Sequence, residues 1–142
     1  TDYQYNSFFV SGNLAFNLIK NIRLTENCRW AISQSKSGNY TNMIRNFSNE
    51  AALSMAFIPD RLILNTNLQY THNSGFTDKK DYTFMNLSIT FKTKKKIQFV
   101  LNVDNVFNTK TFIYRSNSNL SESYTLYQLR PRSVMLTTHF AL

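Results

Sequence analysis

The segment Arg130-Pro-Arg-Ser-Val-Met-Leu-Thr-Thr-His-Phe-Ala-Leu142 decides the fold of this 142-residue chain. Apolar side chains recur at every second position from Val134 onwards, with one mild interruption at Thr138. The set on one face is Val134, Leu136, Thr138, Phe140 and Leu142. A period of two is that of a β-strand, because successive side chains of a strand point to opposite faces. We therefore expect this segment to be the closing strand of a sheet.

The same alternation predicts six strands before it. Their expected ranges are 5–19, 22–33, 42–58, 62–71, 82–91 and 97–104, and we expect the sixth to continue through 105–108 towards Tyr114. The predicted fold is all-β, an antiparallel up-and-down meander of about seven strands. Strand lengths of ten residues or more suit a tilted membrane strand of about 9–11 residues better than a globular strand of about 5–6.

The predicted connections alternate between short and long. Those near residues 20, 59 and 94 take two to four residues, whereas the polar segments 34–41, 73–80 and 115–123 are longer. Transmembrane barrels have short turns at one end and long loops at the other. Aromatic residues also gather towards strand ends, as the two girdles of a barrel do. They are Tyr3, Tyr5, Phe8, Phe9, Tyr40, Tyr70, Tyr82, Tyr124 and Tyr127 at the long-loop end and Phe57, Phe91 and Phe140 at the other.

Alternation also predicts two contrasting faces. The residues expected together on the apolar outer face include Leu14, Leu24, Leu53, Leu64, Leu87, Leu101 and Leu136. Those expected on the polar face include Asn13, Asn17, Asn27, Asn65, Asn67, Asn86 and Asn102. Glu26 and Asn49 interrupt the apolar face. With the loop centred between residues 37 and 38 they lie directly opposite each other, so we expect a hydrogen bond between them, at a contact with another protein.

Composition and charge narrow the function classes. The net charge of +8 and a pI near 9.7 are compatible with a nucleic-acid partner. The basic residues fall at predicted turns, however, and no basic helix accompanies them. We therefore predict no nucleic-acid partner. No stretch approaches the roughly 18 apolar residues of a membrane-spanning helix. The chain opens on 1–4 without a basic and apolar leader, so we expect any signal peptide to have been removed or to lie upstream.

Motifs for chemistry are scarce. Ser33-Gln-Ser-Lys36 matches an SxxK pattern, but it falls in a predicted loop with no following helix. His72 and His139 have no metal-site spacing and Cys28 is the only cysteine, so we predict no metal, no cofactor and no enzyme activity. Asp104, Asn102 and Gln98 form a polar stripe suited to hydrogen bonding. No binding residue is assigned.

Two stretches resemble a known family. They are Leu101-Asn-Val-Asp-Asn-Val-Phe-Asn-Thr-Lys110 and Tyr127-Gln-Leu-Arg-Pro-Arg-Ser-Val-Met-Leu-Thr-Thr-His-Phe140. They are similar to the penultimate and closing strands of the TonB-dependent-receptor-like outer-membrane β-barrel proteins of Bacteroidetes-type bacteria. Leu142 departs from the terminal aromatic residue common in that class, although Phe140 is in phase with it.

The resemblance implies that residues 1–142 are the C-terminal portion of a barrel of about 22 strands in the bacterial outer membrane. The implied function is nutrient or ligand uptake. The implied partners are the lipid bilayer, the remaining barrel strands and plug, the outer-membrane assembly machinery, which would recognise the closing strand, and an energy-coupling protein that acts through the plug. Two alternatives stay open: a complete eight-stranded barrel, obtained by splitting 106–116 from the sixth strand, and a soluble lipocalin-like or sandwich binding protein.

Overall fold

A computed structural model describes residues 3–59, 61–75, 80–94, 97–117 and 122–140. These residues form nine β-strands and no helix. The strands are β1 Tyr3–Ile19, β2 Ile22–Ser37, β3 Tyr40–Ile58, β4 Leu62–Asn73, β5 Asp81–Lys92, β6 Ile97–Asp104, β7 Thr111–Asn117, β8 Glu122–Gln128 and β9 Ser133–Phe140.

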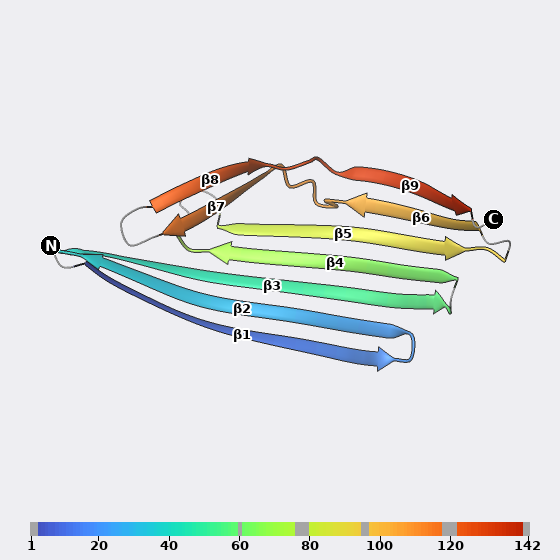
Figure 1. The fold of residues 1–142 in the computed structure, drawn as a ribbon, viewed down its shortest axis with the longest axis horizontal. Helices are drawn as coiled ribbons and strands as arrows, with labels where there is room; N and C mark the ends of the chain where they lie inside the picture. Colours follow the sequence, from blue (N-terminus) through green and yellow to red (C-terminus); the bar gives the residue numbers. More distant parts are fainter. Residues whose placement is uncertain (1–2, 60, 76–79, 95–96, 118–121, 141–142) are drawn as a thin grey trace.

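Seven of the strands form one antiparallel sheet in the order β1-β2-β3-β4-β5-β6-β9, while β7 and β8 pair with each other as a separate hairpin (Figure 1). The prediction of an antiparallel all-β meander is confirmed, and β9 lies beside β6 as expected of a last strand. The sheet is open. Among the described residues, β1 and β9 each have one edge with no neighbouring strand.

The register confirms the predicted apolar face. Directly opposed residues of antiparallel strands point to the same side of a sheet. Leu24 lies opposite Leu53, Leu64 opposite Ile89, and Leu101 opposite both Ile89 and Leu136. Met55, two residues from Leu53, lies opposite Leu64 and links these pairs. Leu14 lies opposite Glu26, two residues from Leu24, and Leu87 is two residues from Ile89 on the same strand. All seven therefore share one side, which we call the outer face; the opposite side is the polar face.

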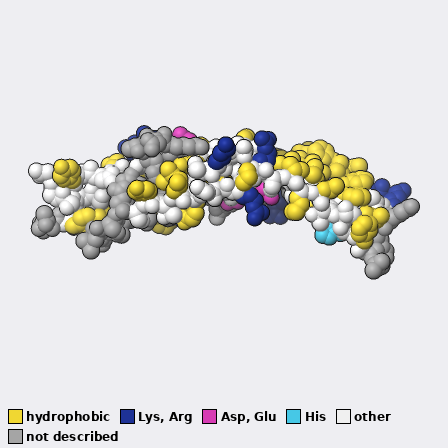
Figure 2. All heavy atoms as spheres, turned by 90° about the horizontal axis from the view of Figure 1, so that it is seen from above, with side chains coloured by type: hydrophobic (Ala, Val, Ile, Leu, Met, Phe, Trp, Pro, Cys, Tyr) yellow, Lys and Arg dark blue, Asp and Glu magenta, His cyan; other side chains and the backbone are white. Residues whose placement is uncertain are grey.

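The main sheet is a single layer. The chain exposes 10563 Å² of surface, against about 7,600 Å² expected for a compact protein of its mass. The described side chains classed as buried are Ile44, Asn73 and Tyr82, all on the polar face at the long-loop end. Figure 2 shows the thin, elongated body, with hydrophobic side chains crowded on one side of its right-hand half. Among the described residues, no second layer covers the outer face, and on the polar face the β7–β8 hairpin covers the long-loop end of β5.

The prediction of a long loop at residues 34–41 is wrong. Strands β2 and β3 continue to Ser37 and Tyr40, leaving a two-residue turn at Gly38-Asn39. Gly38 has a φ of 57°, which suits the first central position of a tight hairpin turn because glycine adopts positive φ without steric cost. The strict alternation of short and long connections therefore fails at this position. Residues 34–41 are polar, and a polar sequence does not distinguish an exposed strand from a loop.

The predicted continuation of the sixth strand is also wrong. Strand β6 ends at Asp104, and residues 105–108 form a turn in which the Asn108 N–H donates to the Asn105 carbonyl oxygen at 2.8 Å. Both asparagines have positive φ, 52° and 54°. The chain then enters β7, so the described residues of the predicted loop 115–123 belong to the β7–β8 hairpin. Residues 118–121 of that loop, and Leu142 of the predicted closing strand, lie outside the described residues.

The β7–β8 hairpin packs against the polar face. The ring of Phe112 meets Tyr82 edge-on, with centroids 5.0 Å apart, and lies 5.8 Å from Phe84. Tyr127, which lies opposite Phe112 on β8, stacks on it with ring centroids 6.4 Å apart. Tyr82 is 2% exposed, so it anchors the hairpin and does not form part of an exposed aromatic girdle. The hairpin thereby covers the long-loop end of β5 on its polar side.

Candidate functional site

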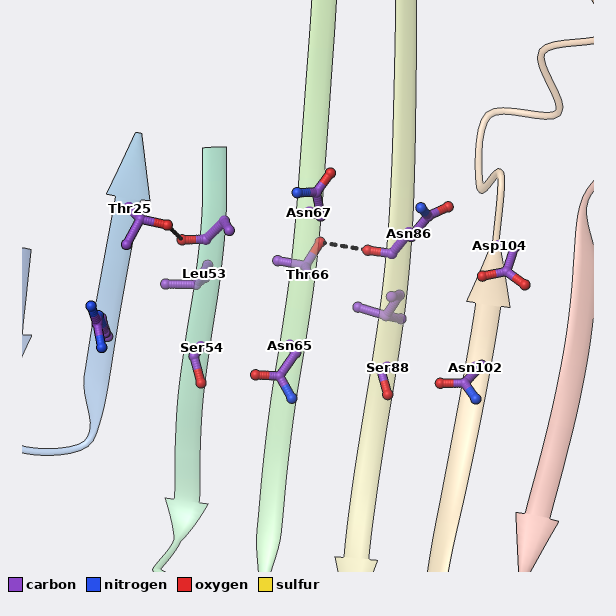
Figure 3. Close-up of a pocket in the computed structure, with 13 residues that line it drawn as sticks. Thr25, Leu53, Ser54, Asn65, Thr66, Asn67, Asn86, Ser88, Asn102 and Asp104 are labelled. Atoms are coloured by element: carbon purple, nitrogen blue, oxygen red, sulfur yellow. Dashed lines mark hydrogen bonds between the residues drawn. The ribbon is translucent and has the colours of Figure 1, made fainter. Parts of the chain in front are cut away.

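The candidate site is a hollow of about 390 Å³ on the polar face, which we call the polar groove (Figure 3). It crosses β2 to β6, and most of its lining side chains are amides and hydroxyls. The lining residues are Arg23, Thr25, Ala52, Leu53, Ser54, Asn65, Thr66, Asn67, Asn86, Leu87, Ser88, Asn102 and Asp104. Four of the seven asparagines predicted on the polar face are among them.

The groove is built by strand register. Five of its residues lie in one line across the sheet, each opposite the next: Arg23, Ser54, Asn65, Ser88 and Asn102. A second line holds Thr25, Ala52, Asn67 and Asn86. Because neighbouring strands are about 4.8 Å apart, each line offers a polar group at nearly every strand spacing. We call such a line of opposed residues a row.

Few of these polar groups are fully used by the chain itself. Asn86 Oδ1 accepts from the Asn105 N–H at 2.9 Å, whereas Thr66, which lies opposite Leu53 and Leu87 and so carries its side chain on the outer face, donates its Oγ1 to the Asn86 carbonyl oxygen at 3.1 Å. The side chains of Asn65 and Asn102 make no hydrogen bond among the described residues. An amide offers both donors and acceptors. The groove can therefore hydrogen-bond water or uncharged polar groups along its length.

Charges lie at the borders of the groove. Arg23 on β2 and Asp104 on β6 are four strands apart, and Asp104 Oδ2 accepts a hydrogen bond from Ser133 Oγ at 3.3 Å. Glu50 lies next to the groove, where its Oε1 accepts from Asn67 Nδ2 at 2.7 Å and from Gln69 Nε2 at 3.3 Å. The centre of the groove is thus uncharged.

The structure places the other predicted residues as follows. Gln98, Asn102 and Asp104 share the polar face as expected, and two of them line the groove. Ser33 and Lys36 lie in β2 and not in a loop, and their odd spacing puts them on opposite faces, so they form no Ser–Lys pair. His139 lies opposite Gln98, while His72 belongs to the outer face.

A junction that the sequence reasoning missed connects the two stretches 101–110 and 127–140. Asn105 Oδ1 accepts from the Thr109 N–H, and Asn105 Nδ2 donates to the carbonyl oxygens of Thr109 and Arg130, all at 2.9 Å. Asn108 Oδ1 accepts from the Arg132 N–H at 3.1 Å. The available signal was the Asn-x-x-Asn spacing, because asparagine tolerates positive φ better than most residues.

The outer face carries one polar cluster in its interior. Asn49 Nδ2 donates to Glu26 Oε1 at 2.8 Å and to Cys28 Sγ at 2.9 Å, and Cys28 Sγ lies 3.5 Å from Glu26 Oε1. The predicted hydrogen bond is confirmed, but the pair is diagonal, because Asn49 lies opposite Cys28 and Glu26 opposite Ala51. The register differs from the expected one by two residues because the turn is centred on Gly38-Asn39.

A second polar cluster closes the outer face at the long-loop end. Asp81 Oδ1 accepts from Tyr70 Oη at 2.6 Å and lies 2.7 Å from His72 Nδ1. The hydrogen bond from Tyr70, with that from His72, holds the pKa of Asp81 below its usual range, and the same bond to Asp81 raises the pKa of Tyr70. This cluster marks where the apolar surface of β4 and β5 ends.

Within the described residues, no group of three or more His, Cys, Asp or Glu side chains is placed to hold a metal ion. That part of the chain also has no helix long and apolar enough to cross a membrane. Comparisons with models of protein families, with curated proteins and with solved structures found no match. The chain is all-β, and its described residues form one open antiparallel sheet with a polar groove on one face.

Proposed function

We propose that this chain is part of the wall of a bacterial outer-membrane β-barrel, the C-terminal portion of a receptor or transporter of the TonB-dependent type. Its function is uptake of a nutrient or ligand across the outer membrane, without an enzymatic reaction. The observation that carries this proposal is the shape of the apolar area on the outer face, which is a band that crosses the strands diagonally.

The upper edge of this band descends from β1 to β9. On each strand we take the outer apolar residue that ends this area towards the long loops; on β3 it is Phe47, because the charged Arg45 separates Met43 from the rest of the area. These residues are Phe8, Ile32, Phe47, Leu68, Met85, Val103 and Val134. The register puts a step of one row between β2 and β3, two rows between β3 and β4, and one row between β5 and β6. The edge thus falls by four rows across seven strands.

The slope of the edge matches the tilt of barrel strands. Four rows of two residues each correspond to about 26 Å along a strand, and six strand spacings to about 29 Å, which gives an angle of about 40°. Strands of outer-membrane barrels are tilted by about 35–45°. The lower edge slants the same way: Ile22 on β2 shares a row with Leu136, whereas on β9 the band continues two rows further, to Phe140. A flat soluble sheet has no reason for such a slant.

The height of the band supports the same interpretation. On β1 it runs from Phe8 to Leu18, about 33 Å along the strand. At a tilt of about 40° this projects to about 25 Å, the height of the apolar belt of an outer-membrane barrel. Both residues are exposed, Phe8 at 60% and Leu18 at 62%. A lipid environment would cover them.

The polar groove then faces the lumen. Hydrated amides suit the interior of a barrel, which is polar in this class. The chain would supply lumen surface and the β7–β8 hairpin at the long-loop end, while the plug and the energy-coupling protein belong to other parts of the system. The free edges of β1 and β9 would pair with further barrel strands, as the open sheet requires.

The complete eight-stranded barrel is the weaker alternative. It needs residues 106–116 to supply an additional wall strand, but the strand that starts at Thr111 pairs with β8, outside the main sheet. The soluble lipocalin-like or sandwich alternative needs a partner layer or closure for the outer face, and the described residues provide neither.

Cell fractionation tests the proposal. The chain, expressed within its natural gene in its own bacterium, should sediment with the outer membrane, resist extraction by alkaline carbonate and migrate differently on a gel before and after boiling in detergent. Recovery in the soluble fraction as a folded protein would contradict the membrane assignment. Recovery in the membrane without a change on boiling would contradict the barrel.

A further inference from the structure

Glu26 lies near the middle of the apolar band. On β2 the band runs from Ile22 to Ile32, so Glu26 is about 13 Å along the strand from one end and about 20 Å from the other. Its neighbours in the same row are Leu14 on β1 and Ala51 on β3. If the outer face meets lipid, as the proposed function requires, this carboxylate is at hydrocarbon depth and out of reach of lipid headgroups.

The described part of the chain satisfies one oxygen of this carboxylate. Oε1 accepts from Asn49 and contacts Cys28, whereas Oε2 has no hydrogen bond and Glu26 no ion pair among the described residues. An unpaired carboxylate in an apolar medium is strongly unfavourable. A donor from outside the chain would remove much of this penalty, and a cationic donor most of all.

The surroundings of Glu26 leave room for such a donor. Gly12 lies opposite Cys28 on β1, and a Cβ atom added to Gly12 would meet nothing within 4 Å. Ala51, opposite Glu26 on β3, is also small. We call these five residues, Gly12, Glu26, Cys28, Asn49 and Ala51, the outer-face notch. Larger apolar residues lie beside it, among them Leu14 and Trp30, so the notch is a small polar interruption of the apolar surface.

We propose that the outer-face notch receives a lysine or arginine side chain from a different membrane-embedded protein. This inference rests on the proposed function, because it requires the outer face to lie in lipid. Charge complementarity selects the partner: the site offers a carboxylate oxygen and open space, and it lacks a cation.

A second copy of this chain is a poorer occupant. Two copies inserted in the same direction can be related only by an axis along the membrane normal, which brings identical residues to the same depth. A symmetric contact through the notch would place two Glu26 carboxylates near each other. The amide of Asn49 is already donated to Glu26 and Cys28, so it offers no new donor to the copy.

Photocrosslinking in native outer membranes tests this proposal. The photoreactive residue p-benzoylphenylalanine replaces Ala51 in the protein expressed from its natural gene, with and without Glu26→Gln. The matched control carries the probe at Met85, which lies in the same row as Ala51 but two strands away. We expect a polypeptide adduct from position 51, at least about tenfold weaker with Glu26→Gln, because removing one partner of a desolvated ion pair is costly.

The identity of the adduct decides the outcome. The crosslinked peptide of the partner should contain a lysine or arginine, and its change to glutamate together with Glu26→Lys should restore the adduct. Adducts with lipid alone, with a second copy, or with a protein regardless of Glu26→Gln would each overturn the inference. If one of these outcomes is found together with lipid adducts at Met85, the inference about the notch fails but the proposed function stands. A soluble protein with no lipid adduct at Met85 would contradict both the inference and the proposed function.

Discussion

Asn105 Nδ2 donates a hydrogen bond to the Arg130 carbonyl oxygen at 2.9 Å, across 25 residues of sequence. The bond joins the end of β6 to the segment that leads into β9, and thus fixes where the β7–β8 hairpin leaves the sheet and returns to it. A backbone hydrogen bond from Leu129 N–H to the Lys110 carbonyl oxygen, at 2.9 Å, closes the same junction. The register of β9 on β6 therefore depends on a side chain as well as on the strand pairing.

Replacing Asn105 by alanine should destabilise the folded chain. The substitution removes three side-chain hydrogen bonds and leaves a non-glycine residue at a φ of 52°. Net hydrogen-bond contributions of about 1 kcal/mol each predict a loss of about 2–3 kcal/mol. Urea unfolding of the protein in lipid vesicles measures it. Asn65→Ala, which removes no hydrogen bond among the described residues, should change the free energy of unfolding by less than about 0.5 kcal/mol; equal effects of the two variants would contradict a special role for Asn105.

Neighbouring residues on β4 should respond oppositely to an added charge. Leu64 lies in the middle of the apolar band and Asn65 lines the polar groove. Leu64→Arg should lower the free energy of unfolding in vesicles by about 2–4 kcal/mol, as expected for a lipid-facing arginine near the bilayer midplane. Asn65→Arg should be tolerated within about 1 kcal/mol because its charge stays in water. Similar stability of both variants would show that the outer face does not meet lipid.

The closing strand should govern assembly through its outer residues. Phe140 lies opposite Ile97 on the outer face, and His139 lies opposite Gln98 on the polar face. We expect Phe140→Ser to slow membrane assembly several-fold, because it removes the last aromatic residue of the set Val134, Leu136, Thr138, Phe140 and Leu142. His139→Ser should assemble at the rate of the unmodified protein. Pulse-labelling followed by the gel shift on boiling gives both rates, and equal slowing would contradict recognition of this face.

The sheet could be predicted from the sequence because apolar residues at every second position indicate a β-strand and also show which residues share a face. A shift by one residue would move Leu24, Leu53 and Leu64 to the other face, so the faces could be assigned without coordinates. The contact between Glu26 and Asn49 was predicted for the same reason, although the turn position was misplaced. Both depend on long strands in which enough apolar positions alternate to define the two faces.

Turns and the groove were harder to predict. The segment 34–41 is polar on both faces because the hairpin extends beyond the apolar band, and polarity alone does not distinguish a strand in water from a loop. The turn at Asn105 and Asn108 depends on contacts with Arg130 and Arg132, which are distant in sequence. The groove depends on which residues of five strands share a row, and that requires the register of every pair.

The β7–β8 hairpin should be held on the sheet by Phe112. Its ring contacts Tyr82, Phe84 and Tyr127, so Phe112→Ala should lower the local stability of the hairpin by about 1–2 kcal/mol. Amide hydrogen exchange should then accelerate in β7 and β8 but not in β2 and β3. Leu126→Ala is the control, since Leu126 is 56% exposed and lies opposite Ile113, off the contact with the sheet. Unchanged exchange in Phe112→Ala would mean that the hydrogen bonds at Asn105 suffice to hold the hairpin.

The 142 residues alone should not form a folded monomer in water. Along the whole of β1, each of the 17 residues is exposed, and β9 exposes Val134 at 67% and Leu136 at 66%. Each of these strands has an unpaired edge, and unprotected edges of this length pair with other chains. Neither edge is interrupted by proline within its bounds, because Pro131 precedes β9.

In detergent-free buffer we therefore expect aggregates in sedimentation velocity. In detergent micelles or lipid vesicles we expect β-structure by circular dichroism, since the apolar band is then covered. A monodisperse monomer that unfolds cooperatively in plain buffer would contradict both the membrane assignment and the need for further barrel strands, because it would show that the sheet is stable with its outer face and both edges in water.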